Sequence, residues 1–146
     1  MAETLRLEIV TPEGIAFSDD VTMVTLPGIE GQLGIYPQHV SLITEIVPGE
    51  IIAHHGSSER LLAVGSGLVD ISAARVAIVT DMAVAAEHID EAKVEAARRR
   101  AEARLREVAS DEEIAAVNAS LARSLAQLHV RRRHRAASPP PAGRIP

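Results

Sequence analysis

Alternating apolar and charged positions are the clearest pattern in the first 87 residues. Leu5, Leu7 and Ile9 are separated by charged residues, and this period of two is typical of a strand with one buried face. Turn signals rich in glycine and proline recur between such segments. The pattern predicts a ten-stranded antiparallel β-sandwich or flattened barrel, with strands over residues 5–10, 15–17, 21–26, 32–35, 40–46, 50–55, 60–64, 68–72, 76–80 and 83–87.

The hydrophobic period changes after residue 88, where apolar residues recur at spacings of three and four. Neither glycine nor proline occurs between Leu68 and Ser138, so nothing interrupts a helix there. Asp90 is a good N-cap and Ser110 begins a capping-box pattern, which predicts two helix starts. The two apolar stripes predict an antiparallel two-helix hairpin, and they consist of Val94, Ala97, Ala101, Leu105 and Val108, and of Ile114, Val117, Leu121, Leu125 and Leu128.

These patterns divide the chain into three parts: a β-domain over 1–87, a helical hairpin over 88–135 and a proline-rich tail over 136–146 that we expect to be disordered. Charge follows the same division. Residues 1–87 hold three Lys and Arg against twelve Asp and Glu, a net charge of −9, whereas residues 88–146 hold twelve against eight, a net charge of +4. Such a split suggests that the two units meet different partners.

Composition narrows the possible functions. Aromatic residues are 1% of the chain, which makes a base-stacking nucleic-acid module unlikely, and cysteine is absent. The basic run Arg131–Arg135 is interpreted as the end of a helix, where cations are favoured, and not as a nucleic-acid patch. No apolar run is long enough to cross a bilayer, so membrane association is expected only through a partner.

No catalytic constellation or metal site is evident. Gly65-Ser66-Gly67 lacks the third small residue of a dinucleotide fingerprint, since Asp70 occupies that position, and we interpret it as a strand turn. The carboxylates are scattered, and nothing pairs them as an acid and a base. The chain is therefore predicted not to be an enzyme by itself and to need no cofactor.

One segment, Glu30–Leu42, is a candidate partner site. Two glycines and a proline surround apolar residues there, and aliphatic side chains at the tip of a hairpin would leave apolar surface in solvent. The alternative, an ordinary buried hairpin, is about as consistent with the composition.

The same segment carries a resemblance to a known family. Thr11–Gly14, Glu30–His39, Pro48-Gly49, Gly65–Gly67 and Ile89-Asp90 occur in the order found in epsilon subunits of the F-type ATP synthase. The chain resembles that family from residue 5 to about residue 130. The Gly-x-Leu-Gly-Ile-x-Pro-x-His run is the most specific part of the match.

The resemblance implies a non-catalytic subunit of the central stalk. The β-domain would bind the gamma subunit and the c ring, and the hairpin would be a mobile brake on ATP hydrolysis. Membership would place the chain peripherally on the cytoplasmic face of the bacterial plasma membrane, in a proton-translocating complex. The interface residues carried over from the family are Glu30, Gln32, Leu33, Gly34, Ile35, Tyr36, His39 and Leu42, with Glu30, Gln32 and His39 facing the c ring and the apolar positions near Leu42 gripping gamma.

Two departures from the family pattern matter. Gln38 stands where the family usually has glycine, so the local turn is expected to differ. Some family members bind ATP on the hairpin, and the matching residues here are Ile89, Asp90 and Lys93. Lysine replaces the arginine of that motif and cannot grip phosphate in two places, so ATP binding is not favoured.

Three functional hypotheses remain. In the first, the hairpin extends and its arginines meet acidic surface on the alpha/beta catalytic head. The second is a nucleotide-sensing module, and the third is a structural adaptor with an immobile hairpin. The arginines that the first hypothesis invokes are Arg98, Arg99, Arg100, Arg104, Arg123 and Arg131–Arg133.

Overall fold

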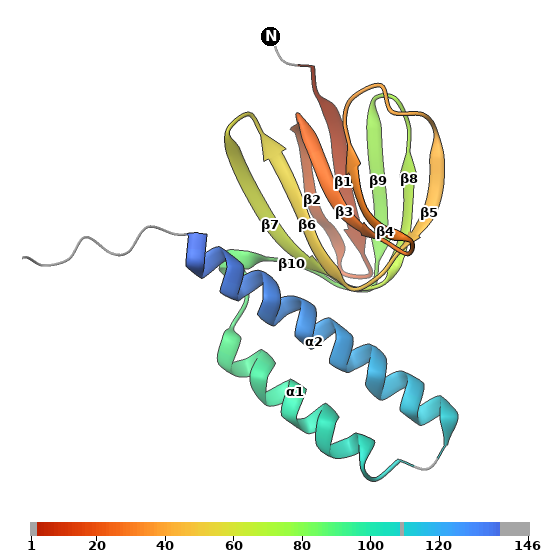
Figure 1. Ribbon diagram of the computed structural model, residues 1–146, viewed down its shortest axis with the longest axis vertical. Coiled ribbons are helices and arrows are strands. Elements are labelled where there is room, and N and C mark those ends of the chain that lie inside the picture. Colours follow the sequence, from red (N-terminus) through yellow and green to blue (C-terminus); the bar gives the residue numbers. More distant parts are fainter. Residues whose placement is uncertain (1–2, 109, 138–146) are drawn as a thin grey trace, which may run out of the picture.

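The computed structural model describes residues 3–108 and 110–137, which form a ten-stranded barrel-like sheet followed by two helices (Figure 1). The strands are β1 (Leu5–Thr11), β2 (Gly14–Val21), β3 (Met23–Gly28), β4 (Gly31–Ile35), β5 (Leu42–Ile46), β6 (Gly49–His55), β7 (Ser58–Val64), β8 (Gly67–Ile71), β9 (Arg75–Thr80) and β10 (Ala83–Ala85). A short 3₁₀ helix, η1 (Ala86–His88), leads to α1 (Glu91–Leu105) and α2 (Asp111–Ala137). The predicted β-domain with a helical hairpin is confirmed.

The strands form one continuous sheet in the order β10-β7-β6-β3-β5-β8-β9-β1-β2, with β4 paired to β3. Neighbouring strands are antiparallel, except that β1 and β9 run parallel, with Leu7 opposite Val76. This pair differs from the antiparallel sheet that the sequence predicts. The alternation of side chains gives each strand's faces but contains no information on the direction of a partner that lies about 70 residues away.

The interior of the barrel is aliphatic. Leu7 and Ile9 of β1 meet Val76 and Ile78 of β9, and all four side chains are fully buried. Phe17 is the aromatic residue of this core. Full burial of one aliphatic side chain contributes ~1.5–3 kcal/mol to stability. The barrel interior alone therefore supplies a substantial driving force for folding.

The helices begin where the sequence predicts. The Asp90 side chain accepts a hydrogen bond from the Lys93 backbone N–H at 3.2 Å, and Ser110 Oγ accepts one from the Glu113 N–H at 3.2 Å. Ile89 and Val94 lie in one apolar cluster, as expected for a hydrophobic staple. Both predicted caps are therefore confirmed.

The buried face of α2 differs from the predicted stripe at Leu125, which is 46% exposed. The helix packs against α1 on one side and against β6 and β7 on another, so Ala126 and Val130 become buried in addition to Val117 and Leu128. A single predicted stripe could not include this second contact.

The ends of the helical unit also differ from the prediction in detail. The last predicted strand, 83–87, ends early because Ala86–His88 forms η1. Ala136 and Ala137, assigned to the tail, still belong to α2. Residues 138–146 of the predicted tail lie outside the described residues.

We expect residues 1–87 to fold alone, because the barrel interior forms its own core of side chains from β1–β9. The second cluster, in which Ile52 and Leu61 meet Leu128 and Val130, is lost on truncation. A chain ending at Glu87 should show one cooperative unfolding transition in urea, monitored by circular dichroism. A non-cooperative transition would mean that the hairpin is part of the barrel's fold.

Gln38 should limit stability, because its φ of +69° lies in the left-handed region. Its backbone N–H is fixed there by a 2.7 Å hydrogen bond to the Ala73 carbonyl. A left-handed conformation costs a residue with a Cβ about 1–2 kcal/mol, and glycine's greater chain entropy offsets part of this. Gln38→Gly should therefore raise the free energy of unfolding by about 0.5–1 kcal/mol.

The control for this prediction is Gln38→Val, since a β-branched residue is least compatible with positive φ. The valine variant should be less stable than the parent chain in the same urea titration. Equal stability of all three chains would show that this turn relaxes without strain.

Candidate interaction surfaces

The predicted interface segment is divided between the two ends of the barrel. Gly31 and Gln32, at the β3–β4 turn, line a cavity together with His129 and Arg133 of α2. Gln38 instead bonds to Ala73 in the β8–β9 turn, at the end where the chain begins (Figure 1). Strand β4 lies between these ends. The structure therefore does not bring Glu30 and Gln32 together with His39, contrary to the common surface that we expected.

Two aliphatic residues of this segment, Leu33 and Ile35, pack in or against the barrel core. Ile35 is 1% exposed and pairs with Val24, while Leu33 is partly buried against the same core. The expectation that Ile35 presents its side chain to a partner is wrong, because the alternation along β4 turns it inward. Gly34 is exposed, and a Cβ there would meet Met23 Cε at 3.1 Å.

The other end of the segment does present apolar surface. Tyr36 is 62% exposed, Val40 is 76% exposed and Leu42 is 39% exposed. His39 Nδ1 lies 2.6 Å from the carbonyl oxygen of Val40. These residues lie close in sequence around the loop between β4 and β5, so the rim is a surface that a partner could cover.

A larger apolar feature runs across the outside of the sheet. Strand register aligns Leu68 with Val79, Val79 with Val10 in the parallel pair, and Val10 with Ile15. We call Leu68, Val79, Val10 and Ile15 the outer apolar row. Leu68, Val79 and Ile15 are 55%, 61% and 67% exposed. Four aliphatic side chains in line on the solvent face are typical of a docking surface.

Sequence reasoning missed this row, although a signal was present. The run Ala77-Ile78-Val79 breaks the alternation of apolar and polar residues, as does Leu68-Val69. Consecutive apolar residues in a strand must point to opposite faces. One of each pair therefore reaches the outside, and the register of four strands was needed to show that these residues align.

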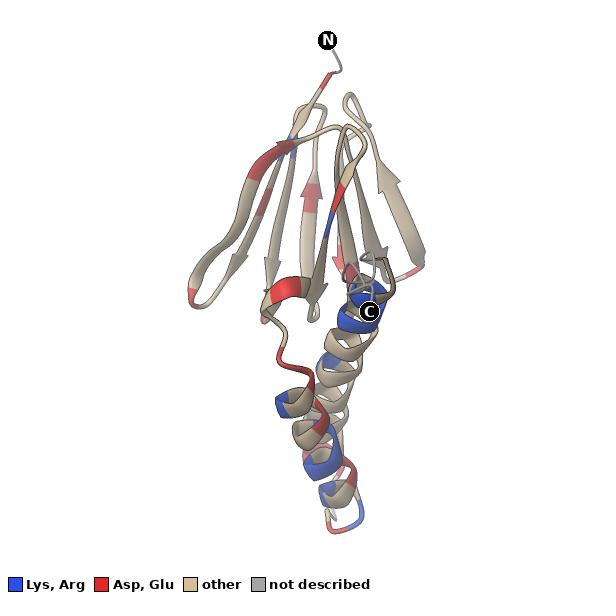
Figure 2. Ribbon diagram, turned by 90° about the vertical axis from the view of Figure 1, so that its left-hand side faces the viewer, with Lys and Arg blue, Asp and Glu red and all other residues tan. Residues whose placement is uncertain are grey.

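The joint between α2 and the barrel combines apolar packing with ion pairs. Leu128 and Val130 pack among Ile52, Leu61 and Ala63 of β6 and β7. Around this cluster, Arg123 lies 3.4 Å from Asp81, Arg131 donates to the Ala86 carbonyl at 3.3 Å, and Arg133 pairs with Glu50. In Figure 2 the strands carry mostly acidic residues, whereas the helices carry most of the basic residues together with several acidic ones. At this joint, basic residues of α2 meet acidic residues of the barrel.

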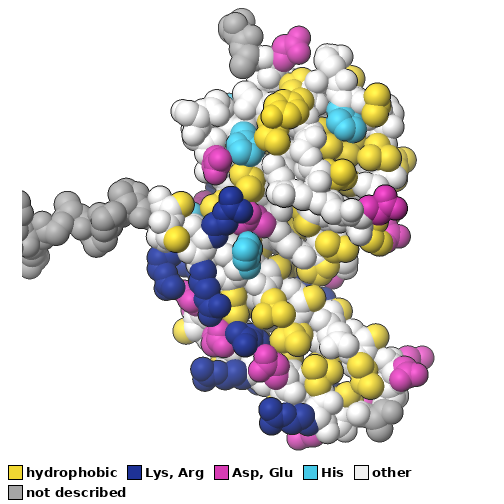
Figure 3. Space-filling model, in the orientation of Figure 1, with side chains coloured by type: hydrophobic (Ala, Val, Ile, Leu, Met, Phe, Trp, Pro, Cys, Tyr) yellow, Lys and Arg dark blue, Asp and Glu magenta, His cyan; other side chains and the backbone are white. Residues whose placement is uncertain are grey.

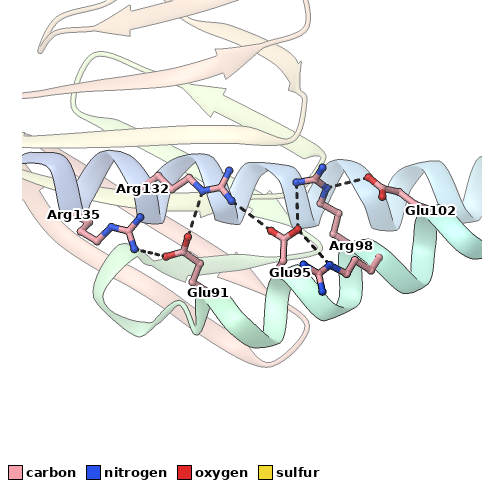
Figure 4. A network of polar contacts seen from close by, with 7 residues as sticks. Glu91, Glu95, Arg98, Glu102, Arg132 and Arg135 are labelled. Carbon is pink, nitrogen blue, oxygen red and sulfur yellow. Dashed lines mark hydrogen bonds and ion pairs between the residues drawn. The ribbon is translucent and has the colours of Figure 1, made fainter.

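The two helices are joined to each other by a chain of ion pairs (Figure 4). Arg132 of α2 bridges Glu91 and Glu95 of α1 at 3.3 and 3.4 Å, and Arg135 reaches Glu91 at 2.9 Å. On α1, Arg98 lies 3.0 Å from Glu102 and 3.5 Å from Glu95. These carboxylates hold the hairpin together along its surface.

This network separates the predicted inhibitory arginines into two groups. Arg98, Arg99, Arg123 and the Arg131–Arg133 run have partners within the chain. Arg100 and Arg104 are exposed and form no ion pair with the residues described here. Both flank a cavity between α1 and α2 of about 350 Å³, whose walls include Ala97 and Val117. In the view of Figure 3, Lys and Arg side chains gather over the helices and their joint with the barrel.

The candidate ATP residues have structural roles in this hairpin. Ile89 is buried beneath the helices, and Asp90 caps α1, while the Lys93 side chain is exposed. ATP binding stays a prediction that is not favoured. Across the described ranges, no group of three His, Asp or Glu side chains is arranged to hold a metal, and neither helix is both long and apolar enough to span a bilayer.

Comparison with solved structures supports this fold. A chain of the Euglena gracilis mitochondrial ATP synthase, in a structure of OSCP, F1 and the c-ring in rotational state 1, matches 86% of this chain and 79% of its own length with a TM-score of 0.72 and 19% identity. A chain of the Tetrahymena thermophila mitochondrial ATP synthase central stalk and c-ring covers 64% of this chain and 72% of its own, with a TM-score of 0.50 and 15% identity. At these identities the likeness shows the fold alone.

Sequence comparison identifies the family. Residues 4–86 match the β-sandwich domain of the ATP synthase delta/epsilon chain, and residues 87–131 match its long α-helix domain. ATP synthase epsilon chain 2 of Syntrophotalea carbinolica is 39% identical over 89% of this chain and 95% of its own, and the epsilon chain of Bordetella avium is 39% identical over 90% and 94%. The chain belongs to the ATP synthase delta/epsilon chain family.

Proposed function

We propose that this chain is the epsilon subunit of a proton-translocating F-type ATP synthase, that its barrel docks on gamma and the c ring, and that its hairpin restrains ATP hydrolysis. Relatives named ATP synthase epsilon chain match both units of the chain at 35–39% identity. As an epsilon chain it is a non-catalytic subunit of the complex. Its association with the membrane is peripheral and runs through that complex, which we place on the cytoplasmic face of the bacterial plasma membrane.

The outer apolar row is the observation that carries the docking role. A partner that covers Leu68, Val79 and Ile15 removes three largely exposed aliphatic side chains from water, and full burial of such a side chain contributes about 1.5–3 kcal/mol. The gamma subunit is the partner we assign to this row, since a permanent rotor interface favours apolar contact. The polar β3–β4 turn, with Glu30 and Gln32 exposed, is then left for the c ring.

The geometry of the joint supports a hairpin that can leave the barrel. The apolar cluster between the hairpin and the barrel has fewer residues than the core inside the barrel, and two of them are alanines, Ala63 and Ala86. The Arg123–Asp81 pair is exposed by 35% and 44%, and such surface pairs contribute only about 0–1 kcal/mol. The docked and extended states then differ by a few kcal/mol, which is the range in which a partner can shift the population.

The two other functions that the sequence suggests place different demands on the hairpin. An immobile adaptor needs a joint too stable to open, and a nucleotide sensor needs the hairpin to bind ATP. The exposed pair Arg100 and Arg104 favours the brake, because two unpaired guanidinium groups on α1 can meet acidic surface elsewhere in the complex.

We expect Leu68→Asp and Val79→Asp together to weaken gamma binding at least about tenfold, because a charge in the centre of an apolar interface leaves it desolvated and unpaired. Binding of the purified chain to gamma would be measured by calorimetry. Leu125→Asp is the matched control, since Leu125 is similarly exposed but lies on α2.

Circular dichroism and urea titration would confirm that the Leu68 and Val79 variants keep their fold, since both side chains point outward. Ile35→Asp is the contrasting variant, and it should unfold the barrel because Ile35 is in the core. Unchanged gamma binding by a folded double variant would remove the outer apolar row from the interface.

Arg100→Ala with Arg104→Ala should raise ATP hydrolysis by the assembled complex. In the parent complex, hydrolysis should also rise with salt, because charge contacts of an extended hairpin are screened, and the double variant should lose much of that salt response. Arg75→Ala, an arginine on the outside of the barrel, serves as the control. Unchanged hydrolysis in a normally assembled complex would favour the immobile adaptor.

A further inference from the structure

Glu50 is a buried carboxylate at the joint between the barrel and α2. It is the second residue of β6, directly after Gly49, where a Cβ would lie 2.9 Å from Pro27 Cβ. This close approach places the start of β6 against the end of β3. The Glu50 side chain is only 9% exposed, and it lines a cavity with Gln32 and His129.

The two carboxylate oxygens of Glu50 have different surroundings. Oε1 accepts a hydrogen bond from the Arg133 guanidinium of α2. Oε2 is buried and has no hydrogen-bond partner among the residues that the structure describes. A buried carboxylate with one oxygen unsatisfied is costly, since a group of this kind loses its hydration without full compensation.

Charged and titratable groups face Glu50 from α2 and from β7. Arg133 and His129 of α2 favour its ionised form, whereas Glu59 of β7 disfavours it. The effect of burial outweighs the effects of Arg133 and His129, so the pKa of Glu50 is raised above its ordinary value of 4.5. The helix that covers the carboxylate therefore also supplies the arginine that makes its burial tolerable.

We propose that Glu50 acts as a built-in release element, a charge that α2 must bury in order to dock, so that the docked hairpin is destabilised by ionised Glu50 and stabilised by neutral Glu50. The proposal rests on the hairpin's ability to leave the barrel, which is part of the proposed function. The burial of this one side chain then keeps the free-energy difference between the docked and released hairpin small, as regulation requires. Only the carboxylate of this pair is buried, since the Arg133 side chain is 49% exposed, and burying an ionised carboxylate costs more than burying a neutral group of similar shape.

The direction of the pH effect follows from proton linkage. When the hairpin leaves the barrel, Glu50 returns to water and its pKa falls toward the ordinary value. Docking therefore takes up protons, and it strengthens as pH falls from above the raised pKa toward 4.5. Above the raised pKa the carboxylate is ionised in both states, and the full cost of burying it opposes docking.

The test measures hairpin release in the full-length chain. The chain has no cysteine, so Ala73→Cys in the β8–β9 turn and Ala119→Cys on α2, both exposed, accept a donor and an acceptor dye specifically. Energy transfer then reports the urea concentration at which half of the hairpins have left the barrel. Circular dichroism of the same samples reports unfolding of the strands.

Glu50→Gln should move this midpoint to higher urea at pH 7, and it should flatten the pH dependence between pH 7 and 5 relative to the parent chain. Arg133→Ala should weaken docking at pH 7, on the order of tenfold in the docking equilibrium constant, because it leaves the buried carboxylate unpaired. In the Glu50→Gln background, Arg133→Ala should have a much smaller effect. This coupling between the two positions is the signature of the proposed arrangement.

Two control variants separate Glu50 from other charges. Glu45→Gln neutralises an exposed carboxylate of β5 and should leave the midpoint unchanged. Arg123→Ala removes an arginine from the exposed pair with Asp81 and should cause only a small, salt-sensitive loss of docking.

The proposal is overturned if Glu50→Gln weakens docking as Arg133→Ala does, since the pair would then be an ordinary stabilising salt bridge. It is also overturned if the parent chain and Glu50→Gln respond identically to pH. If hairpin release coincides with unfolding of the strands in every variant, the hairpin is no separate two-state element, and the brake of the proposed function fails with it. A failure confined to Glu50 leaves the brake intact.

Discussion

The packing of α2 on the outside of β6 and β7 determines what this molecule can do. Leu128 and Val130 bury themselves against Ile52 and Leu61, separately from the core inside the barrel. Because the two clusters are distinct, we expect the barrel to keep its interior whether or not the helices are present. A partner or a change in charge can then act on the second cluster without cost to the first.

Ion pairs set the specificity of this packing more than its strength. The acidic strands and basic helices bring Asp81 opposite Arg123 and Glu50 opposite Arg133, which fixes the position of α2 along the barrel. Exposed pairs contribute little because water already solvates both ions. The Glu50 pair is more sensitive, since its carboxylate is buried and removal of Arg133 would leave that carboxylate unpaired and poorly solvated. Ion pairs thus have two roles in this joint. The pair at Asp81 orients the hairpin, and the pair at Glu50 makes docking of the hairpin depend on the charge of that carboxylate.

Local patterns in the sequence predicted most of the local structure. The features that these patterns missed depend on contacts between residues far apart in the chain. Alternation identified ten strands, and the caps at Asp90 and Ser110 placed both helix starts, because these signals depend on neighbouring residues. The parallel pairing of β1 with β9 depends on the whole topology. Ile35 was assigned to a surface because glycines around it suggested a tip, but its register opposite Val24 turns it into the core. The outer apolar row appears only when four strands are aligned.

Gly65 shows how a local motif acquires a distant role through packing. The sequence marks Gly65-Ser66-Gly67 as a strand turn, and it connects β7 to β8 as expected. A Cβ at Gly65 would lie 1.8 Å from Asp81 Oδ1 and 3.4 Å from Arg123 Cδ. Any side chain larger than hydrogen would therefore displace the carboxylate that receives Arg123 from α2. The backbone of Gly65 does not itself require glycine, because its φ is not positive. Glycine is needed here because it leaves room for the ion pair between Asp81 and Arg123. The strand turn and the hairpin are in this way parts of one joint, although more than 50 residues separate them in the sequence.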